Sequence, residues 1–393
     1  MWVTIAIALL FVSLIWSLTG RRKGLPPGPT CYPIIGNVGL FKPSEAVQGH
    51  RRLRKIYGDF YSMMIFHKPM IIVHGYQNIR ELLGKHGDMF SERPKGFASE
   101  VITKGKGLIW SSGPLWKEQR TFALTTMRKF GFGRRCMESQ IIEEGFVKEM
   151  IEEHKRNFDE DNINDYIDTY LLEQKQRSNE VDTTFTDEQL NYSVQDFFAA
   201  GTETTSTTLR WALLYLIHHQ DWQKGLQNDI DDVIGQGQPK MEHKDKLPRV
   251  EAFILEVQRL GNLVPINLPH APKEDFTYNG HLFPKGAIVF CVLDSVMMDP
   301  DIFPEPSEFK PERFLDPSGK CSGEQKDSMV PFATGRRACL GESLAKMELF
   351  LFLTRFLQTF DVKPENPNCL PSLDSTLGIT NMPLPFNVVL NKR

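Results

Sequence analysis

The stretch PFATGRRACLG, from Pro331 to Gly341, places a single cysteine, Cys339, among small and turn-forming residues. The run ESLAKMELFLFLTRFL follows directly at residues 342–357 and has the apolar content of a packed helix. A cysteine just before a helix lies where backbone N–H groups point outward and the helix dipole is positive, so we expect its thiol pKa to be lowered. The alternative is an inert, buried thiol.

The residues around Cys339 indicate which chemical role this cysteine has. Gly335 and Gly341 let the backbone approach a large flat group, and Arg337 adds a positive charge two residues before the cysteine. A thiolate is a soft metal ligand, and a nearby arginine is suited to anionic groups. The spacing F-x-x-G-x-R-x-C-x-G, which begins at Phe332, therefore favours a haem with two propionates over an inert cysteine.

Charge and cysteine content exclude several other classes of protein. The chain has 393 residues, of which 41% are hydrophobic and 24% charged, and its net charge is −3. These values indicate a large folded protein, and the nearly balanced charge argues against nucleic-acid binding. The six cysteines include no CxxC pair, which argues against a zinc module or a disulfide scaffold.

The N-terminal segment is typical of a membrane anchor. Residues 2–18 are almost wholly apolar and are followed by the basic residues 21–23. At about 1.5 Å per residue, this run can just span the hydrocarbon of a bilayer. The basic cluster then predicts that the rest of the chain lies in the cytosol. We expect an anchor over residues 1–20, a basic and proline-rich connector over 21–30 and a catalytic domain over 31–393, with a cleaved signal peptide as the alternative.

Hydrophobic periodicity predicts a mainly helical fold with a minor β-sheet lobe. A hairpin is expected over residues 57–73, with its turn at Lys68-Pro69. Thr186, with Gln189 three residues later, is typical of a capping box and begins a helix to about residue 216 that is apolar on all sides and therefore buried. We also expect short strands over 264–293, a polar loop over 173–184 and helices over 77–86, 115–130, 137–157, 221–234, 249–260 and 342–361.

The cysteine loop resembles the haem-binding loop of cytochrome P-450 enzymes. This resemblance implies the cytochrome P-450 fold, with Cys339 as the axial thiolate ligand of haem b. It also implies that Phe332, Gly335, Arg337 and Gly341 help to hold the cofactor. The thiolate would donate electron density to the iron and favour cleavage of the O–O bond.

The motif AAGTETTSTT, within the long predicted helix, carries the same resemblance independently. Gly201 weakens a helix interior, and a carboxylate such as Glu203 is costly to bury in an apolar helix. The motif is similar to the oxygen-binding groove of the family. By that likeness Thr204 hydrogen-bonds the bound oxygen, Glu203 supplies protons, and Ala200 and Gly201 flank the haem. The alternative is a packing face of small residues whose hydroxyls bond i−4 carbonyls.

Glu256 and Arg259 lie i,i+3 on one predicted helix, a spacing that alone is typical of a weak surface ion pair. Together with Arg313 in PERF, they resemble the family's buried structural triad.

Trp116 and Arg120, in LWKEQR, resemble partners of the haem propionates, as do Arg337 and His270 in LPHAP. The alternative for the first pair is an ordinary amphipathic helix face.

The PPGP after the anchor, GLIWSSGPLWKEQR and AGTETTSTTLRWALLYL resemble the animal microsomal branch of the family, which oxidises drugs, fatty acids and steroids. This likeness implies a location at the endoplasmic reticulum membrane, electrons from NADPH through NADPH–cytochrome P-450 reductase, and cytochrome b5 as a further candidate partner. Contacts to a lipophilic substrate are expected from residues 102–108, 197, 198, 264–268 and 377–380. Basic residues that could dock the reductase, or are simply scattered surface charge, are Lys117, Arg128, Lys129, Arg134, Arg135 and Arg336.

The resemblance covers residues 1–146 and 147–393, but not as one continuous copy. Full members of the family are about 100 residues longer, so several central helices are predicted to be missing near 146–147. Residues 137–157 would then join parts of two helices. Two functions remain open: a haem-thiolate monooxygenase acting on a lipophilic substrate, or a non-catalytic, membrane-tethered shortened variant with impaired haem binding. An oxygen-independent isomerase is disfavoured, because it needs no acid–hydroxyl pair such as Glu203 and Thr204.

Overall fold

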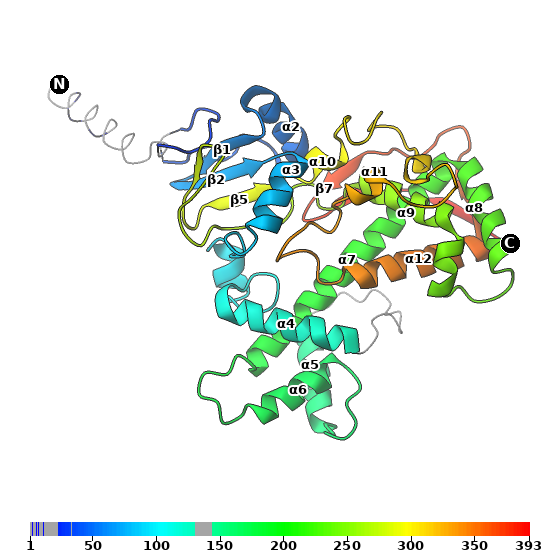
Figure 1. The fold of residues 1–393 in the computed structure, drawn as a ribbon, viewed down its shortest axis with the longest axis horizontal. Helices are drawn as coiled ribbons and strands as arrows, with labels where there is room; N and C mark the ends of the chain where they lie inside the picture. The colour runs from blue at the N-terminus through cyan, green and yellow to red at the C-terminus, as the bar shows by residue number, and fades with distance from the viewer. Residues whose placement is uncertain are drawn as a thin grey trace.

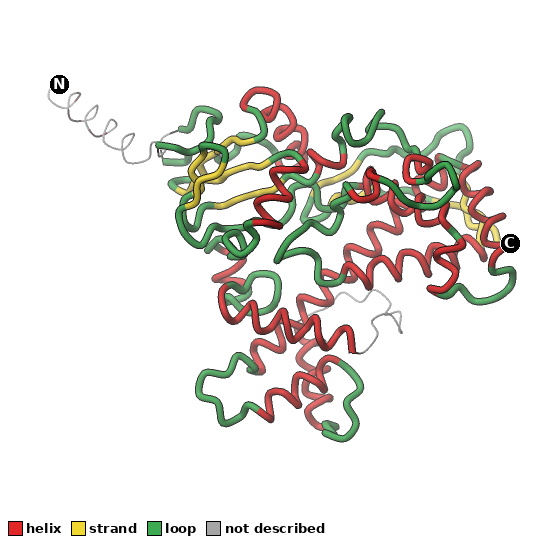
Figure 2. Tube along the Cα trace, viewed as in Figure 1, coloured by secondary structure: helices red, strands yellow, loops and turns green. Residues whose placement is uncertain are grey.

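The fold is mainly helical with small sheets, as the sequence predicts (Figures 1 and 2). The computed structural model describes residues 2, 5, 7, 11, 23–32, 34–129 and 144–393. Most of the predicted anchor and residues 137–143 of a predicted helix therefore lie outside the described residues. Among the described residues, no helix combines the length and the apolar content that crossing a membrane requires.

A sheet lobe forms from the N-terminal part of the chain and one later strand. β1 (Phe60–Ile65) pairs antiparallel with β2 (Lys68–Val73), and β2 pairs parallel with β5 (Ile288–Cys291). The predicted hairpin is confirmed, but its predicted turn is wrong because Lys68 and Pro69 already belong to β2. The chain reverses at residues 66–67, where Phe66 adopts a left-handed φ of 55°.

The central helix α7 (Asp187–His218) runs diagonally through the body (Figure 1). The N-cap half of its predicted capping box is confirmed, since the Thr186 side chain accepts a hydrogen bond from the Gln189 amide at 3.1 Å. The Gln189 side chain does not return this bond but contacts Gly107 and Ser193. Its C-terminal half packs in an apolar core with α8 (Gln220–Val233), α9 (Pro248–Gly261) and α12 (Glu342–Thr359). The expectation that α7 is buried is wrong at residues 187, 188, 199–201, 203 and 206, which are exposed. Their small or polar side chains offer little apolar area to drive packing.

The N-terminal half of α7 joins α4 (Gly113–Lys129), α5 (Glu144–Arg156) and α6 (Tyr166–Gln176) in a smaller bundle (Figure 1). The sequence does not predict α6, and the loop predicted over 173–184 is wrong at its first four residues. Three apolar residues at helical spacing explain the helix: Ile167, Tyr170 and Leu171 are buried against α5 and α7.

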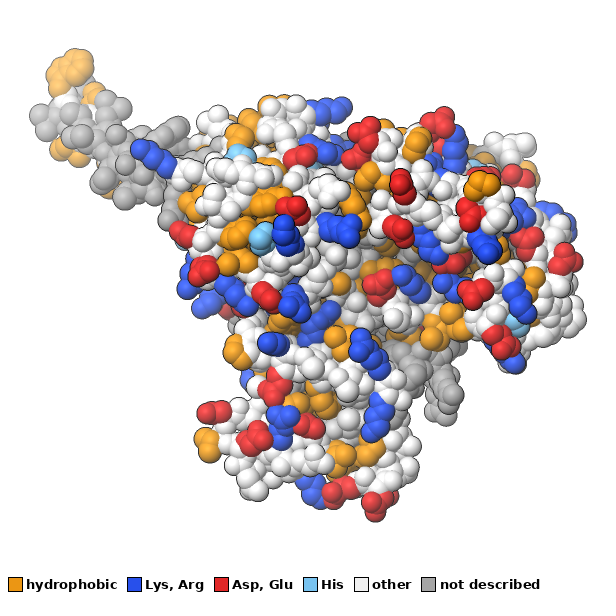
Figure 3. All heavy atoms as spheres, in the orientation of Figure 1, with side chains coloured by type: hydrophobic (Ala, Val, Ile, Leu, Met, Phe, Trp, Pro, Cys, Tyr) orange, Lys and Arg blue, Asp and Glu red, His pale blue; other side chains and the backbone are white. Residues whose placement is uncertain are grey.

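The other described elements are short and connect these parts. Among them β3 pairs with β4, β6 with β9 and β7 with β8, each in antiparallel fashion. Basic and acidic side chains are interspersed over the face shown in Figure 3, in keeping with the small net charge. The elements are η1 (Pro43–Glu45), α2 (Ala46–Tyr57), α3 (Tyr76–Ile79), η2 (Arg80–Lys85), η3 (Phe97–Ile102), η4 (Met241–Lys246), β3 (Phe276–Tyr278), β4 (His281–Phe283), α10 (Asp294–Met297), η5 (Pro311–Phe314), α11 (Glu324–Asp327), β6 (Phe360–Pro364), β7 (Ser375–Leu377), β8 (Asn381–Pro383) and β9 (Val388–Lys392).

Candidate active site

The cysteine loop, residues 331–341, crosses η2 of the sheet lobe before α12 begins. Gly335 has a φ of 82°, and a Cβ at this position would lie 1.6 Å from the Leu83 carbonyl oxygen. Only glycine fits this crossing. The Cys339 amide donates to the Phe332 carbonyl at 2.9 Å and so closes the loop.

Cys339 lies directly before α12, as predicted, and is exposed by surface area. Nevertheless, partial burial of its sulfur raises the pKa of the thiol, and the Glu342 carboxylate raises it further; the Gly341 amide and Arg120 act in the opposite direction. The expected lowering of the thiol pKa is therefore wrong for the polypeptide by itself, because desolvation outweighs the helix N-terminus. A metal ion at the sulfur would displace the thiol proton outright.

Three arginines gather beside this loop, and none of them forms a salt bridge with another described residue. Arg337 donates to the carbonyls of Ser91 at 2.8 Å and Ser111 at 2.6 Å. Arg120 donates to a loop carbonyl at 2.5 Å, and Arg93 donates to the carbonyls of residues 109 and 269. Burial, followed by repulsion from Arg93 and Arg120, lowers the pKa of Arg337 to about 8. Burial, followed by repulsion from Arg120, lowers the pKa of Arg93 to about 10.

Two further predicted residues adjoin this arginine cluster. The ring centroid of Trp116 lies 3.7 Å from the guanidinium carbon of Arg337, and the indole N–H is buried without a hydrogen-bond partner among the described residues. His270 is also buried, and its Nδ1 lies 2.8 Å from the Phe90 carbonyl. Burial, followed by repulsion from Arg93, lowers the pKa of His270 to about 3.

These residues fit a haem. Clustered positive charge without a paired carboxylate, together with an unsatisfied indole donor, is suited to a group that carries two carboxylates. The adjacent loop offers the Cys339 thiol as an iron ligand, and its glycines leave room for a large flat group near the backbone. Arg93, Arg120, Arg337, Trp116 and His270 would hold the carboxylates, and Cys339 would hold the metal.

The predicted oxygen groove lies on the exposed face of α7. The Thr204 hydroxyl donates to the Ala200 carbonyl at 2.7 Å, which is the i−4 bond of the alternative interpretation. The alternative also fits Thr208, which is buried and donates to the Thr204 carbonyl at 2.9 Å. It does not fit Ala200, Gly201 and Glu203, which are exposed. The Glu203 carboxylate accepts a hydrogen bond from the Thr380 hydroxyl at 3.0 Å.

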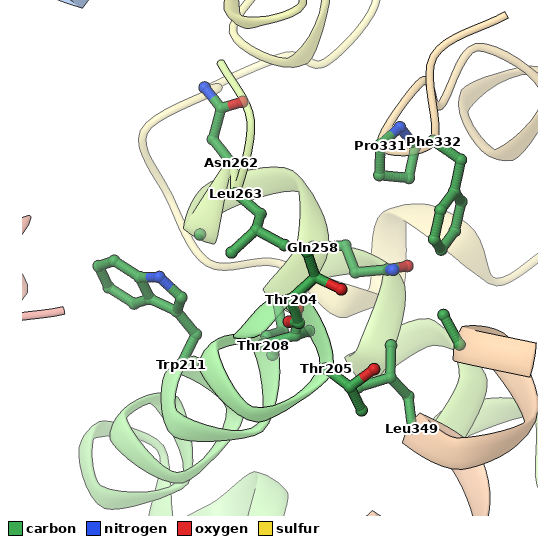
Figure 4. Close-up of a pocket in the computed structure, with 13 residues that line it drawn as sticks. Thr204, Thr205, Thr208, Trp211, Gln258, Asn262, Leu263, Pro331, Phe332 and Leu349 are labelled. Atoms are coloured by element: carbon green, nitrogen blue, oxygen red, sulfur yellow. The ribbon is translucent and has the colours of Figure 1, made fainter. Parts of the chain in front are cut away.

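One pocket brings the helix and the cysteine loop together. Figure 4 shows Thr204 from α7 and Phe332 from the loop at the edge of the same cavity, with residues of α9 and α12 completing it. Thr204 of one predicted motif and Phe332 of the other thus line the same pocket although they are far apart in the sequence. The other lining residues are Thr205, Thr208, Trp211, Val257, Gln258, Gly261, Asn262, Leu263, Pro331, Ala345 and Leu349.

Comparison with known proteins agrees with this arrangement. The sequence model of the family described as Cytochrome P450 matches residues 26–145 and 132–390. The chain belongs to the cytochrome P450 family. It is 31% identical to cytochrome P450 2C8 of Homo sapiens and 32% identical to cytochrome P450 2C20 of Macaca fascicularis, each over 98% of both chains. It is 30% identical to cytochrome P450 2U1 of Bos taurus over 98% of this chain and 92% of that protein.

The chain is a shortened P450. Its alignment with the human relative has 483 positions, 90 more than the 393 residues present, so at least 90 of those positions have no counterpart in this chain. The two ranges matched by the family model overlap at residues 132–145. The predicted junction at 146–147 lies just beyond that overlap and stays a prediction.

The three residues of the proposed P450 triad form one buried network. Arg259 donates to Glu256 through Nε at 2.7 Å and Nη2 at 2.8 Å, and Arg313 donates to the same carboxylate at 3.2 Å. The side chains of Glu256 and Arg259 are 0% exposed, so the alternative of a solvated surface pair is wrong. Arg259 also donates to the carbonyls of Met297 and Pro306, at 2.8 and 2.7 Å. The network therefore ties α9 to the irregular segment before η5.

Sequence reasoning misses two residues that the structure places in or beside the candidate site. Arg93 belongs to the cluster, and its only local signal is a cation placed directly before proline in SERP. Asp196 on α7 accepts the amides of Leu108 and Ile109 at 2.6 and 2.9 Å, and it fixes the loop whose carbonyls hold Arg93 and Arg337. Burial raises the pKa of Asp196 to about 6, although the two amides oppose this shift.

None of the residues predicted to contact substrate lines the P450 pocket, although residues 264–268 directly follow the lining residue Leu263. Phe197 packs edge-to-face on Tyr166 with ring centroids 4.9 Å apart, and Phe198 joins the core between α5, α6 and α7. The turn at 377–380 reaches α7 through Thr380. Of the basic residues proposed for docking, Lys117, Arg128, Lys129 and Arg336 are exposed, whereas Arg134 and Arg135 lie outside the described residues.

Proposed function

We propose that this P450 is a haem-thiolate monooxygenase that inserts one atom of O2 into a lipophilic substrate. Membership of the P450 family supports a haem monooxygenase in general. That this shortened chain is itself active is our proposal. The observation that carries it is the pocket shared by Thr204 and the cysteine loop, beside one buried and two half-buried arginines, Arg93, Arg120 and Arg337, that form no salt bridge with another described residue. We further propose that the chain acts at the endoplasmic reticulum membrane and receives electrons from NADPH through a reductase.

When bound, the haem would supply the activation of O2. In the balanced reaction, the substrate, O2, NADPH and one proton give the hydroxylated product, water and NADP⁺. The protein must therefore bind the cofactor, deliver protons and keep the substrate near the reacting atoms.

The site residues divide these tasks. Cys339 would hold the iron through its sulfur, while the arginines and the Trp116 indole would orient the carboxylates. Thr204 can turn its hydroxyl from the Ala200 carbonyl toward the pocket, and Glu203 on the preceding position can hold and release a proton. Leu263, Phe332 and Leu349 give the cavity an apolar wall, but its volume of about 40 Å³ must increase to admit a whole lipophilic substrate, because ligand pockets typically measure about 300–1,000 Å³.

The test is a reduced carbon-monoxide difference spectrum of the full chain. We expect a thiolate-type Soret band for the wild type and for Cys369→Ala, a control at another exposed cysteine, and no such band for Cys339→Ala. A band that persists in Cys339→Ala would contradict the ligand assignment. A wild-type chain that is folded but takes up no haem would instead support the non-catalytic, membrane-tethered variant.

A further inference from the structure

Thr380 lies between β7 and β8 and contacts the proposed acid of the site. Its side chain is 4% exposed, and its hydroxyl donates to Oε1 of Glu203 at 3.0 Å. Thr207, one turn along α7, donates to the same oxygen over a longer distance of 3.5 Å. Thr380 is therefore the shorter and better placed donor to this carboxylate.

The backbone around Thr380 is held from three directions. The Gly378 amide donates to the Thr380 carbonyl at 2.9 Å and closes the turn. The next residue, Asn381, donates its amide to the Leu263 carbonyl at 2.8 Å and its side chain to the Gly261 carbonyl at 2.9 Å. Its carbonyl accepts from the Trp211 indole at 2.9 Å. The hydroxyl is thus presented to α7 from a turn anchored on both α7 and α9.

We propose that Thr380 is a positioning residue that fixes the orientation of the Glu203 carboxylate for proton delivery. Glu203 is exposed and has a long side chain, so its carboxylate would otherwise sample several rotamers. A hydroxyl that donates to an ionised carboxylate makes one of the stronger hydrogen bonds in proteins. Because this bond acts on Oε1, it selects one side-chain orientation without occupying both oxygens.

This inference rests on the proposed function, but it differs from a substrate-contact role for the same residue. A residue that contacts substrate changes KM and substrate affinity when it is altered. A residue that positions the proton donor changes kcat and the fraction of electrons that reach product, and leaves substrate affinity unchanged.

The first experiment reads Glu203 directly and does not require haem. The carboxylate infrared band of Glu203 is isolated by subtracting the spectrum of Glu203→Gln from that of the full chain. We expect Thr380→Val, which keeps the shape but loses the donor, to shift this band, and Thr380→Ser to restore it. Thr376→Val, at an exposed position of the same hairpin, should leave the band unchanged. An unshifted band in Thr380→Val would overturn the proposal, even in a preparation that takes up no haem.

The second experiment uses the haem-loaded chain with a turned-over substrate and reductase. General acid–base assistance is worth about 10²–10⁴-fold, and its partial loss in Thr380→Val should lower kcat about tenfold at unchanged KM, with more peroxide released per NADPH. Thr380→Ser should recover most of the rate. The solvent isotope effect on kcat should rise in the valine variant. A change confined to KM would assign Thr380 to substrate contact instead, whereas an absent carbon-monoxide band would count against the proposed function alone.

Discussion

Replacing Glu256 by glutamine should destabilise the fold strongly, although it alters the shape of the side chain very little. Glu256 is 0% exposed, and its carboxylate accepts from Arg259, Arg313 and the Lys310 amide, the last at 2.8 Å. Glutamine removes the only negative charge of the network and leaves two guanidinium groups buried. Breaking a buried pair in this way typically costs about 3–5 kcal/mol, out of about 5–15 kcal/mol for a whole domain.

This prediction is measured by urea unfolding of the full chain, followed by far-UV circular dichroism. The loss should appear as a lower midpoint with an unchanged slope. Glu305→Gln is the matched control on the same irregular segment, because that carboxylate is exposed and, among the described residues, forms its salt bridge with Lys310. The unfolding midpoint of this variant should hardly move. The double variant Glu256→Gln/Arg313→Met should lose less than the sum of the two single changes, since it removes one of the two stranded charges. A loss below about 1 kcal/mol for Glu256→Gln would refute the view that the triad is held by charge.

Two other changes test the site directly. Gly335→Ala should abolish haem uptake, because the added Cβ would lie 1.6 Å from the Leu83 carbonyl oxygen. Gly286→Ala is the control, because Gly286 has a similar φ of 70° but a Cβ there would have no neighbour within 4 Å. This control variant should still give the carbon-monoxide band. Haem uptake by both variants would refute the steric argument. The pKa of Asp196 is raised from 3.8 to about 6, so the folded state binds the proton of this carboxyl more tightly than the unfolded state does. The free energy of unfolding should therefore fall by up to about 3 kcal/mol as the pH rises from about 4 to 7. Asp196→Asn should remove this component from urea unfolding between pH 4.5 and 7.5, and an unchanged pH profile would contradict the assignment.

The parts of the fold that the sequence predicts are those with strong local signals. The Thr186 cap and the apolar run of α7 specify a helix without reference to the rest of the chain. By contrast, α6 has only three apolar contacts within a polar stretch, and its stability comes from α5 and α7 packing against it. The position of the hairpin turn was mispredicted because proline is common in turns, whereas here Pro69 lies inside β2.

The candidate site divides in the same way. The motifs around Cys339 and around Glu203 and Thr204 can be recognised because each is one continuous stretch of sequence, and the chemistry of these residues stays a prediction. Arg93 and Asp196 acquire their roles only through loops that the fold brings together. The shift in the pKa of Cys339 is likewise a tertiary effect, since desolvation by packed segments opposes the local helix terminus.

The hydrogen bonds that connect α7 to the cysteine loop do not depend on the part of the chain where the shortening is predicted. Asp196 holds the amides of Leu108 and Ile109, and Arg337 binds the carbonyls of the same two residues at 3.3 and 3.4 Å. One short loop therefore links α7 to the cysteine loop through hydrogen bonds that involve no residue between 112 and 195. Residues 199–201, 203 and 206 of α7, which are exposed, take no part in these hydrogen bonds. We therefore expect the shortening to affect how this exposed face of α7 holds a substrate and excludes water, while the residues that would bind haem keep their mutual geometry.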